Sequence, residues 1–214
     1  AQEPEQFYSA DGAYIYETNP NVKKAWKVAT DIAPYAGSAA VFSTEWNAAI
    51  VDGNAAAVLA PSWMLTMIKG IAPDLSGSWN VATVPGGAGN WGGSWVTVSK
   101  SSKHAEAARE FVEWLLAPEQ QKTIFLTKGN FPSAVAALED EAVTGYQDVY
   151  FQNAPVGQIY SSAVSSLKPA ILGPKSASIG TSFNNATTTV AQGTKTAAQA
   201  WAAAIAEIEQ NIQQ

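Results

Sequence analysis

Short apolar runs that lead directly into amphipathic helices constrain the fold of this chain more than any other feature. The run Ala55–Ala60 ends at Pro61, and a helix is predicted from there to about Gly70. Continuous apolar runs of this length are typical of buried strands. Two more strands are predicted over Asn80–Val84 and Ser94–Val98. This order of elements favours an α/β fold in which helices pack on a small sheet.

Amphipathic helices account for most of the remaining sequence. Asn19 and Pro20 supply an N-cap and a first helical position for the first clear helix. Thr196 and Gln199 form a capping box for the last helix. The helices outnumber the strands, so we expect a sheet that lacks some of its strands. Further helices are predicted over residues 43–52, 103–116, 118–128, 134–138, 156–167 and 179–192.

Charge and residue usage exclude several kinds of site. The chain carries 12 Lys and Arg against 18 Asp and Glu, a net charge of −6, and Arg109 is its one arginine. Such a chain is a poor partner for nucleic acid, which is bound through its phosphates. With no cysteine and a single histidine, His104, the chain offers neither a thiol nucleophile nor a Cys- or His-rich metal site. We therefore expect no metal and no cofactor.

Targeting segments are not expected in this chain either. No run of about 18 apolar residues occurs, so a membrane-spanning helix is not predicted. The first residues, Ala1–Glu5, lack the basic and apolar regions of a signal peptide.

Trp63 and the glycine-rich loop over residues 85–93 are the features best suited to contact a ligand. Trp63 follows a predicted strand, and ligands of open α/β sheets bind outside the carboxyl ends of strands. The loop lacks the lysine and the following helix of a phosphate-binding loop. Tryptophan faces suit the apolar faces of sugar rings, while amides and hydroxyls suit sugar hydroxyl groups. Such side chains surround the loop: Asn90, Trp91, Ser94 and Trp95.

Each of these features also has a purely structural interpretation. Trp63 could belong to the core, and the glycines could form a plain tight turn. Trp26, Trp114 and Trp201 lie on helix faces and are expected in the core. A glycosidase needs two carboxylates across the scissile bond, and no isolated pair stands out. A binding protein is therefore favoured, with a carbohydrate-active enzyme or an adhesive surface protein as the alternatives.

Several segments of the chain match one known family in the same order. They are AAAVLAPSW (55–63), VPGGAGNWGGSWVTVSKSSKHAEAAREFVEWLLAPEQQ (84–121), GNFPSAVAALED (129–140), YQDVYF (146–151), LKPAILGP (167–174) and the final helices over 179–212. With these segments the chain resembles the carbohydrate-binding extracellular solute-binding proteins (family 1) of ATP-driven importers. That group includes maltodextrin-binding protein.

The resemblance implies a class II periplasmic-binding-protein fold, of which this chain covers the later half. Such proteins have two α/β lobes, and this chain would hold the second lobe plus a returning piece of the first. Residues 1–93 and 145–214 would belong to the second lobe and residues 94–144 to the first. The rest of the N-terminal lobe, the signal peptide and any lipid anchor would then lie outside this sequence. That division explains the shortage of strands and predicts uncovered apolar surface.

The resemblance also implies a function without catalysis. The protein would be extracellular, attached to the cell surface or periplasmic. It would capture an oligosaccharide between two lobes and deliver it to the membrane permease subunits of an ABC importer. Its partners would be that ligand, the permease and the missing N-terminal lobe, with no nucleic acid.

Site residues carry over from the family by position. Trp63 matches an aromatic residue that stacks on a sugar ring in the second lobe. Phe183 falls near a second stacking aromatic, where tryptophan is more usual. The remaining ligand-binding residues match a crossover loop that lines the cleft: Asn90, Trp91, Ser94 and Trp95. No catalytic residue and no metal ligand is expected.

Overall fold

The computed structural model describes residues 2–37 and 39–213 and divides into two compact units. Unit 1 takes its described residues from Glu3–Trp46 and Lys168–Gln214, and unit 2 from Gln2 and Asn47–Leu167. The lobe boundaries predicted at residues 93 and 144 both lie inside unit 2. The assignment of segments to lobes stays a prediction, and the outermost residues of the predicted ranges, Ala1 and Gln214, lie outside the described residues.

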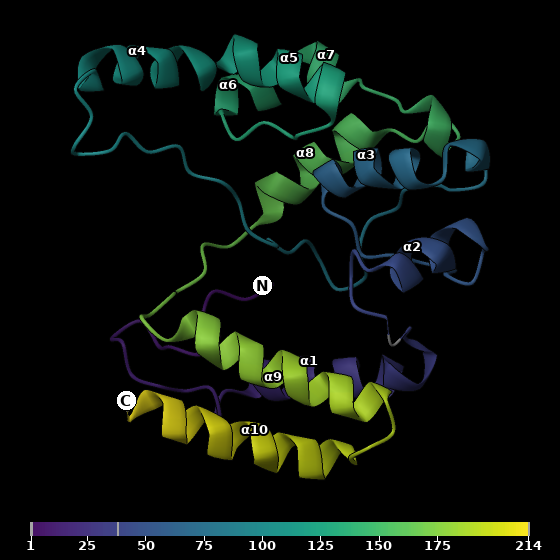
Figure 1. Ribbon diagram of the computed structural model, residues 1–214, viewed down its shortest axis with the longest axis vertical. Helices are drawn as coiled ribbons and strands as arrows, with labels where there is room; N and C mark the ends of the chain where they lie inside the picture. Colours follow the sequence, from purple (N-terminus) through teal and green to yellow (C-terminus); the bar gives the residue numbers. More distant parts are fainter. Residues whose placement is uncertain (1, 38, 214) are drawn as a thin grey trace. The chain divides into compact units, whose positions relative to one another are not determined.

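Helices build both units (Figure 1). Unit 1 contains α1 (Pro20–Ile32), the 3-10 helix η1 (Ala33–Tyr35), α9 (Ser176–Ala191) and α10 (Ala197–Ile212). Helix α2 (Thr44–Val51) begins in unit 1 and ends in unit 2. Unit 2 continues with α3 (Ser62–Ile71), η2 (Pro73–Leu75), α4 (Ala105–Leu115), α5 (Pro118–Lys128), α6 (Val135–Leu138), α7 (Glu141–Thr144), η3 (Val149–Phe151) and α8 (Val156–Ser166). No helix in the described ranges is both long and apolar enough to cross a membrane.

The three predicted strands are wrong as strands of a sheet. Residues 55–60, 80–84 and 94–98 lie outside helices but pair with no other strand among the residues that the structure describes. Two isolated antiparallel bridges, Tyr8–Tyr14 and Asp148–Ala154, are the β-pairing found there. A strand is completed by hydrogen bonds to a neighbour's backbone. The apolar runs favour extended structure, but the described part of the chain supplies no neighbour for them.

The antiparallel helices α9 and α10 form the centre of unit 1, where they lie side by side (Figure 1). The predicted capping box is confirmed, because Thr196 accepts from the Gln199 N–H and Gln199 reaches back to the cap. The two helices also share a polar contact, in which the Ser182 hydroxyl donates to Glu207 Oε1 at 2.8 Å. One apolar face of α10 lies against the core of unit 1: Trp201, Ile205, Ile208 and Ile212.

Gln121 on α5 joins three parts of unit 2 through hydrogen bonds. Its Nε2 donates to the Leu116 carbonyl at the end of α4, at 2.7 Å. Its Oε1 accepts from the backbone N–H groups of Ser133 at 2.8 Å and Ala134 at 3.1 Å, before α6. One side chain thus holds the α4–α5 corner and the turn after α5, satisfying backbone groups that helix ends leave unpaired.

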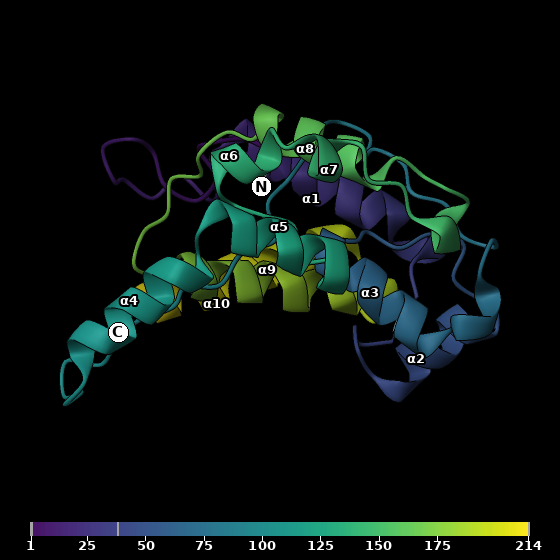
Figure 2. The same cartoon turned by 90° about the horizontal axis from the view of Figure 1, so that it is seen from above.

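Helix α4 presents an apolar face that the described residues leave open. Figures 1 and 2 both show α4 extending away from α5, its main helical neighbour. Trp114 is 55% exposed and Phe111 57% exposed, with ring centroids 5.8 Å apart. The predicted core position of Trp114 is therefore wrong, whereas Trp26 and Trp201 do pack against the core of unit 1. An amphipathic pattern identifies an apolar face but not the element that covers it.

Gly129 allows α3 and α5 to approach closely. It ends α5 in the left-handed conformation, with φ at 77°, and its N–H donates to the Phe125 carbonyl. A Cβ on Gly129 would overlap the Thr66 hydroxyl on α3. That hydroxyl donates to the Lys128 carbonyl at 3.0 Å, so it is not free to move away. Glycine is needed here for both its backbone freedom and its size.

We predict that Gly129→Ala lowers the free energy of unfolding by about 2–4 kcal/mol, because left-handed strain adds to overpacking. Gly53→Ala is the matched control, since Gly53 has a φ of 72° with open space around its Cα. It should cost only the conformational strain, about 1–2 kcal/mol. Urea unfolding, monitored by circular dichroism, measures the free energy of unfolding of both variants. Equal losses would contradict the close contact between α3 and α5.

Candidate ligand-binding site

Trp63 faces solvent from the first turn of α3. Pro61 precedes the helix in an extended conformation, and the side chains on either side of Trp63, those of Ser62 and Met64, are buried. The Ser62 hydroxyl accepts from the Phe131 N–H at 3.1 Å. Because these neighbours face inward, Trp63 is turned outward and remains 39% exposed. Its surroundings are those of a surface aromatic rather than a core residue.

The glycine-rich loop brings Trp91 next to Trp63. The two ring centroids lie 6.3 Å apart, and the ring planes are inclined by 55°. Trp91 is 57% exposed. Asn90 Oδ1 accepts from the Gly92 N–H at 2.7 Å, which closes a short turn around Trp91. Gly92 has a φ of 124°, a conformation that suits glycine.

Ser94 and Trp95 lie in the extended segment that follows the loop. Both are exposed, Trp95 to 85%. Asn90, Ser94 and the three tryptophans of this region are all uncharged, so the surface suits a neutral polar ligand.

Phe183 lies in unit 1, on α9, and contributes to an aromatic cluster there. Its ring centroid is 5.3 Å from that of Trp201, 6.0 Å from Trp26 and 5.8 Å from Phe7. The side chain is half-buried by these contacts. Because Phe183 belongs to unit 1 and Trp63 to unit 2, its role as a second stacking aromatic stays a prediction.

Tyr160 on α8 positions the segment that leads to Trp63. Its hydroxyl donates to the Ala60 carbonyl at 2.9 Å. Burial raises the pKa of Tyr160 to about 12, so the phenol keeps its proton and its donor role at neutral pH. No sequence motif pointed to Tyr160. The only sequence signal is a tyrosine inside an amphipathic helix, which does not reveal a partner one hundred residues away.

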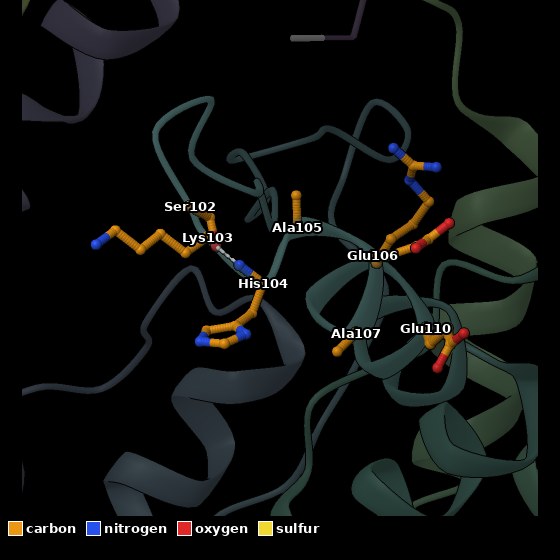
Figure 3. Close-up of a pocket in the computed structure, with 8 residues that line it drawn as sticks. Ser102, Lys103, His104, Ala105, Glu106, Ala107 and Glu110 are labelled. Atoms are coloured by element: carbon orange, nitrogen blue, oxygen red, sulfur yellow. Dashed lines mark hydrogen bonds between the residues drawn. The ribbon is translucent and has the colours of Figure 1, made fainter.

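Two hollows in unit 2 are lined by neither Trp63 nor Trp91. One is lined by consecutive residues at the start of α4, and Figure 3 shows Lys103, His104 and Glu106 pointing in different directions. Side chains that diverge in this way do not form a binding constellation. The other lies beside the end of α2 and is lined partly by Trp79, a residue that the sequence analysis did not single out. Within the described ranges, no three His, Cys, Asp or Glu side chains gather as a metal site would require.

Comparisons with known proteins agree with this description. The family described as bacterial extracellular solute-binding protein matches residues 4–151. A crystal structure of an extracellular solute-binding protein of family 1 is similar, with a TM-score of 0.84 and 32% sequence identity over 98% of this chain and 55% of that chain. No curated protein matches the sequence.

A second solved structure shares the fold at lower sequence identity. It is the ABC transporter associated binding protein from B. animalis subsp. lactis Bl-04, in complex with beta-1,6-galactobiose. Its TM-score is 0.71 and its identity 20%, over 92% of this chain and 51% of that chain. The present chain thus spans about half the length of the solved structures it matches. These similarities confirm the predicted fold class and favour a binding protein over an enzyme. The chain belongs to the family of bacterial extracellular solute-binding proteins.

Proposed function

We propose that this chain is part of an extracellular protein that captures an oligosaccharide and delivers it to the permease subunits of an ABC importer. The observation that carries the proposal is the exposed pair of Trp63 and Trp91 beside a glycine-rich loop, in a chain of this family. A protein of the same fold was solved with beta-1,6-galactobiose, which supports a sugar ligand. The protein would work at the cell surface or in the periplasm.

The ligand is held without covalent chemistry. Trp63, Trp91 and Trp95 offer ring faces to the apolar C–H surfaces of sugars. Asn90 and Ser94 supply amide and hydroxyl groups for sugar hydroxyls. Phe183 is the further stacking aromatic that the resemblance to the family implies. Closure of the two lobes is favoured only as far as the ligand binds the closed state more tightly than the open one.

The lobe arrangement is part of the same proposal. Residues 1–93 and 145–214 belong to the second lobe, and residues 94–144 return to the first. The rest of the first lobe covers the apolar face of α4. Two observations support this: Phe111 and Trp114 on α4 are exposed, and the solved structures that this chain matches are about twice as long.

We predict that Trp63→Ala raises the dissociation constant for the preferred oligosaccharide about tenfold, since one stacking platform is lost. The free energy of unfolding should fall by no more than about 2 kcal/mol, because the side chain lies at the surface and leaves no enclosed cavity. Fluorescence titration of the 214-residue chain with malto-, cello-, xylo-, chito- and β-1,6-galacto-oligosaccharides measures affinity, and urea unfolding measures stability.

Trp114→Ala is the matched control for this titration, because Trp114 is an exposed tryptophan of α4, far along the chain from the loop. It should leave the affinity unchanged. A stability loss of about 3–5 kcal/mol for Trp63→Ala with unchanged affinity would show a core tryptophan instead. The absence of saturable binding for every sugar would contradict the proposed function.

We predict that the 214-residue chain self-associates through α4 when the rest of the first lobe is not present. The double variant Phe111→Gln and Trp114→Gln should weaken this association about tenfold or more, because exposed aromatic pairs dominate such contacts. Sedimentation velocity over a concentration series measures the strength of the self-association. Val149→Gln is the control, since Val149 is exposed on η3 away from α4. Unchanged association of the double variant would count against an apolar interface on α4.

A further inference from the structure

A hollow of about 400 Å³ lies within unit 2, between the end of α2 and the turn that follows η2. Aliphatic side chains make up most of its lining, and Asp52, Ser78 and Trp79 carry its polar side-chain atoms. We propose that this hollow binds a small organic cation whose charge is carried on an apolar body, such as an alkylated ammonium ion. Both the site and the class of ligand differ from those of the proposed sugar site.

The hollow is separate from the tryptophan pair. Trp63 lies in the first turn of α3, whereas Leu75, which lines the hollow, follows the opposite end of that helix. The axis of α3 rises about 12 Å between Trp63 and Ile71. The Leu75 N–H donates to the Ala72 carbonyl at 3.1 Å, which keeps Leu75 at that far end. A small ligand held in the hollow is therefore out of reach of Trp63.

One wall of the hollow attracts positive charge. That wall is the C-terminal end of α2, where the backbone carbonyls form the negative end of the helix dipole. Asp52 directly follows α2 and adds a full negative charge at a position where the dipole favours a cation. The last turn of α2 holds no basic residue, and none of the described residues that line the hollow is basic. Asp52 forms no ion pair with any described residue, so its charge is available to a ligand.

The rest of the lining suits an apolar body rather than a sugar. Ile50 is fully buried and Trp79 is half-buried. Among the described residues of the lining, the side-chain groups that can hydrogen-bond are the Asp52 carboxylate, the Ser78 hydroxyl and the Trp79 N–H, which is too few for the many hydroxyl groups of a sugar. They are also too few oxygen ligands for a bare metal ion. An indole, in contrast, attracts organic cations through the electron-rich face of its ring.

Hydrogen bonds hold both walls of the hollow in place. After α2, the Ala55 N–H donates to the Ala49 carbonyl at 2.9 Å. In the turn after η2, the Gly77 N–H donates to the Tyr150 carbonyl at 2.8 Å, and Gln152 Nε2 donates to the Gly77 carbonyl at 3.0 Å. A hollow whose walls are fixed in advance loses less affinity to the ordering of those walls when a ligand binds.

Choline is the probe for this site, and 3,3-dimethylbutan-1-ol, which has the same shape without the charge, is its control. The 214-residue chain is titrated with each compound while the indole N–H resonances are followed by two-dimensional NMR. Trp79→Phe identifies the resonance of Trp79. That resonance should shift saturably with choline, and choline should bind about tenfold more tightly than the alcohol, because the alcohol lacks the positive charge.

Asp52→Asn should weaken choline binding about fivefold or more, since it removes the negative charge and keeps the shape of the side chain. Asp74→Asn is the matched control, because Asp74 is an exposed aspartate of η2 that does not line the hollow. It should change the affinity for choline less than about twofold. Thermal unfolding of each variant verifies that the fold is intact.

Three results would overturn the cation site. The first is a Trp79 resonance that does not shift saturably with choline. The second is equal binding of choline and the alcohol, which would show a merely apolar hollow. The third is an equal loss of choline affinity in Asp52→Asn and Asp74→Asn, because the attraction would then come from the acidic surface as a whole. Each of these results leaves the proposed function standing, since oligosaccharide binding is measured separately.

Discussion

The close contact between α3 and the turn after α5 fixes the direction in which Trp63 points. Ser62 and Thr66 lie one turn apart on α3, and each bonds to the backbone of that turn, at Phe131 and Lys128. Gly129 makes the approach possible, because any side chain there would overlap Thr66. With one face of α3 tied to this turn, Trp63 is left on the open side. The outward direction of Trp63 thus depends on a glycine and two hydroxyl groups in the contact between α3 and this turn.

The far end of α3 is held by a second set of polar contacts. Lys69 Nζ pairs with Asp148 Oδ2 at 2.7 Å, and Asp148 is buried. The Tyr150 hydroxyl donates to the Ala72 carbonyl at the end of the helix, and burial raises the pKa of Tyr150. Both ends of α3 are therefore joined to residues that lie well over fifty positions away in the sequence. This explains why sequence patterns predicted the helix but not the contacts that orient it.

Local signals predicted the helices well, because a cap needs only residues within one turn. The Asn19 cap of α1 and the Thr196 capping box of α10 are both present. The predicted strands failed for the opposite reason, since a strand depends on backbone partners that local sequence does not supply. The prediction that Trp114 lies in the core failed for the same reason. The pattern around it identified the apolar face of α4, but the described residues leave its two large aromatic side chains more than half exposed.

Trp63 and Trp91 of the glycine-rich loop lie side by side, although the sheet predicted around them does not form in the described residues. The contact survives because it depends on two local features: an outward-facing helix start and a loop turned by glycine and Asn90. No pattern in the sequence pointed to Tyr160, whose bond to Ala60 joins elements far apart in the chain. Exposed aromatic residues in distinctive local sequence are therefore easier to single out than the residues that hold them in place.

Two exposed aromatic pairs in unit 2 differ in the elements that carry them and in the charge of their neighbours. Phe111 and Trp114 share one helix face, and the charged side chains of Glu110 and Glu113 alternate with them along α4. That is the pattern of a helix built to pack against protein. Trp63 and Trp91 come from two separate elements, are set at a wide angle and have neutral polar neighbours in the loop. The tryptophan pair therefore consists of two separately held rings, whereas a single amphipathic face offers one continuous surface to another helix.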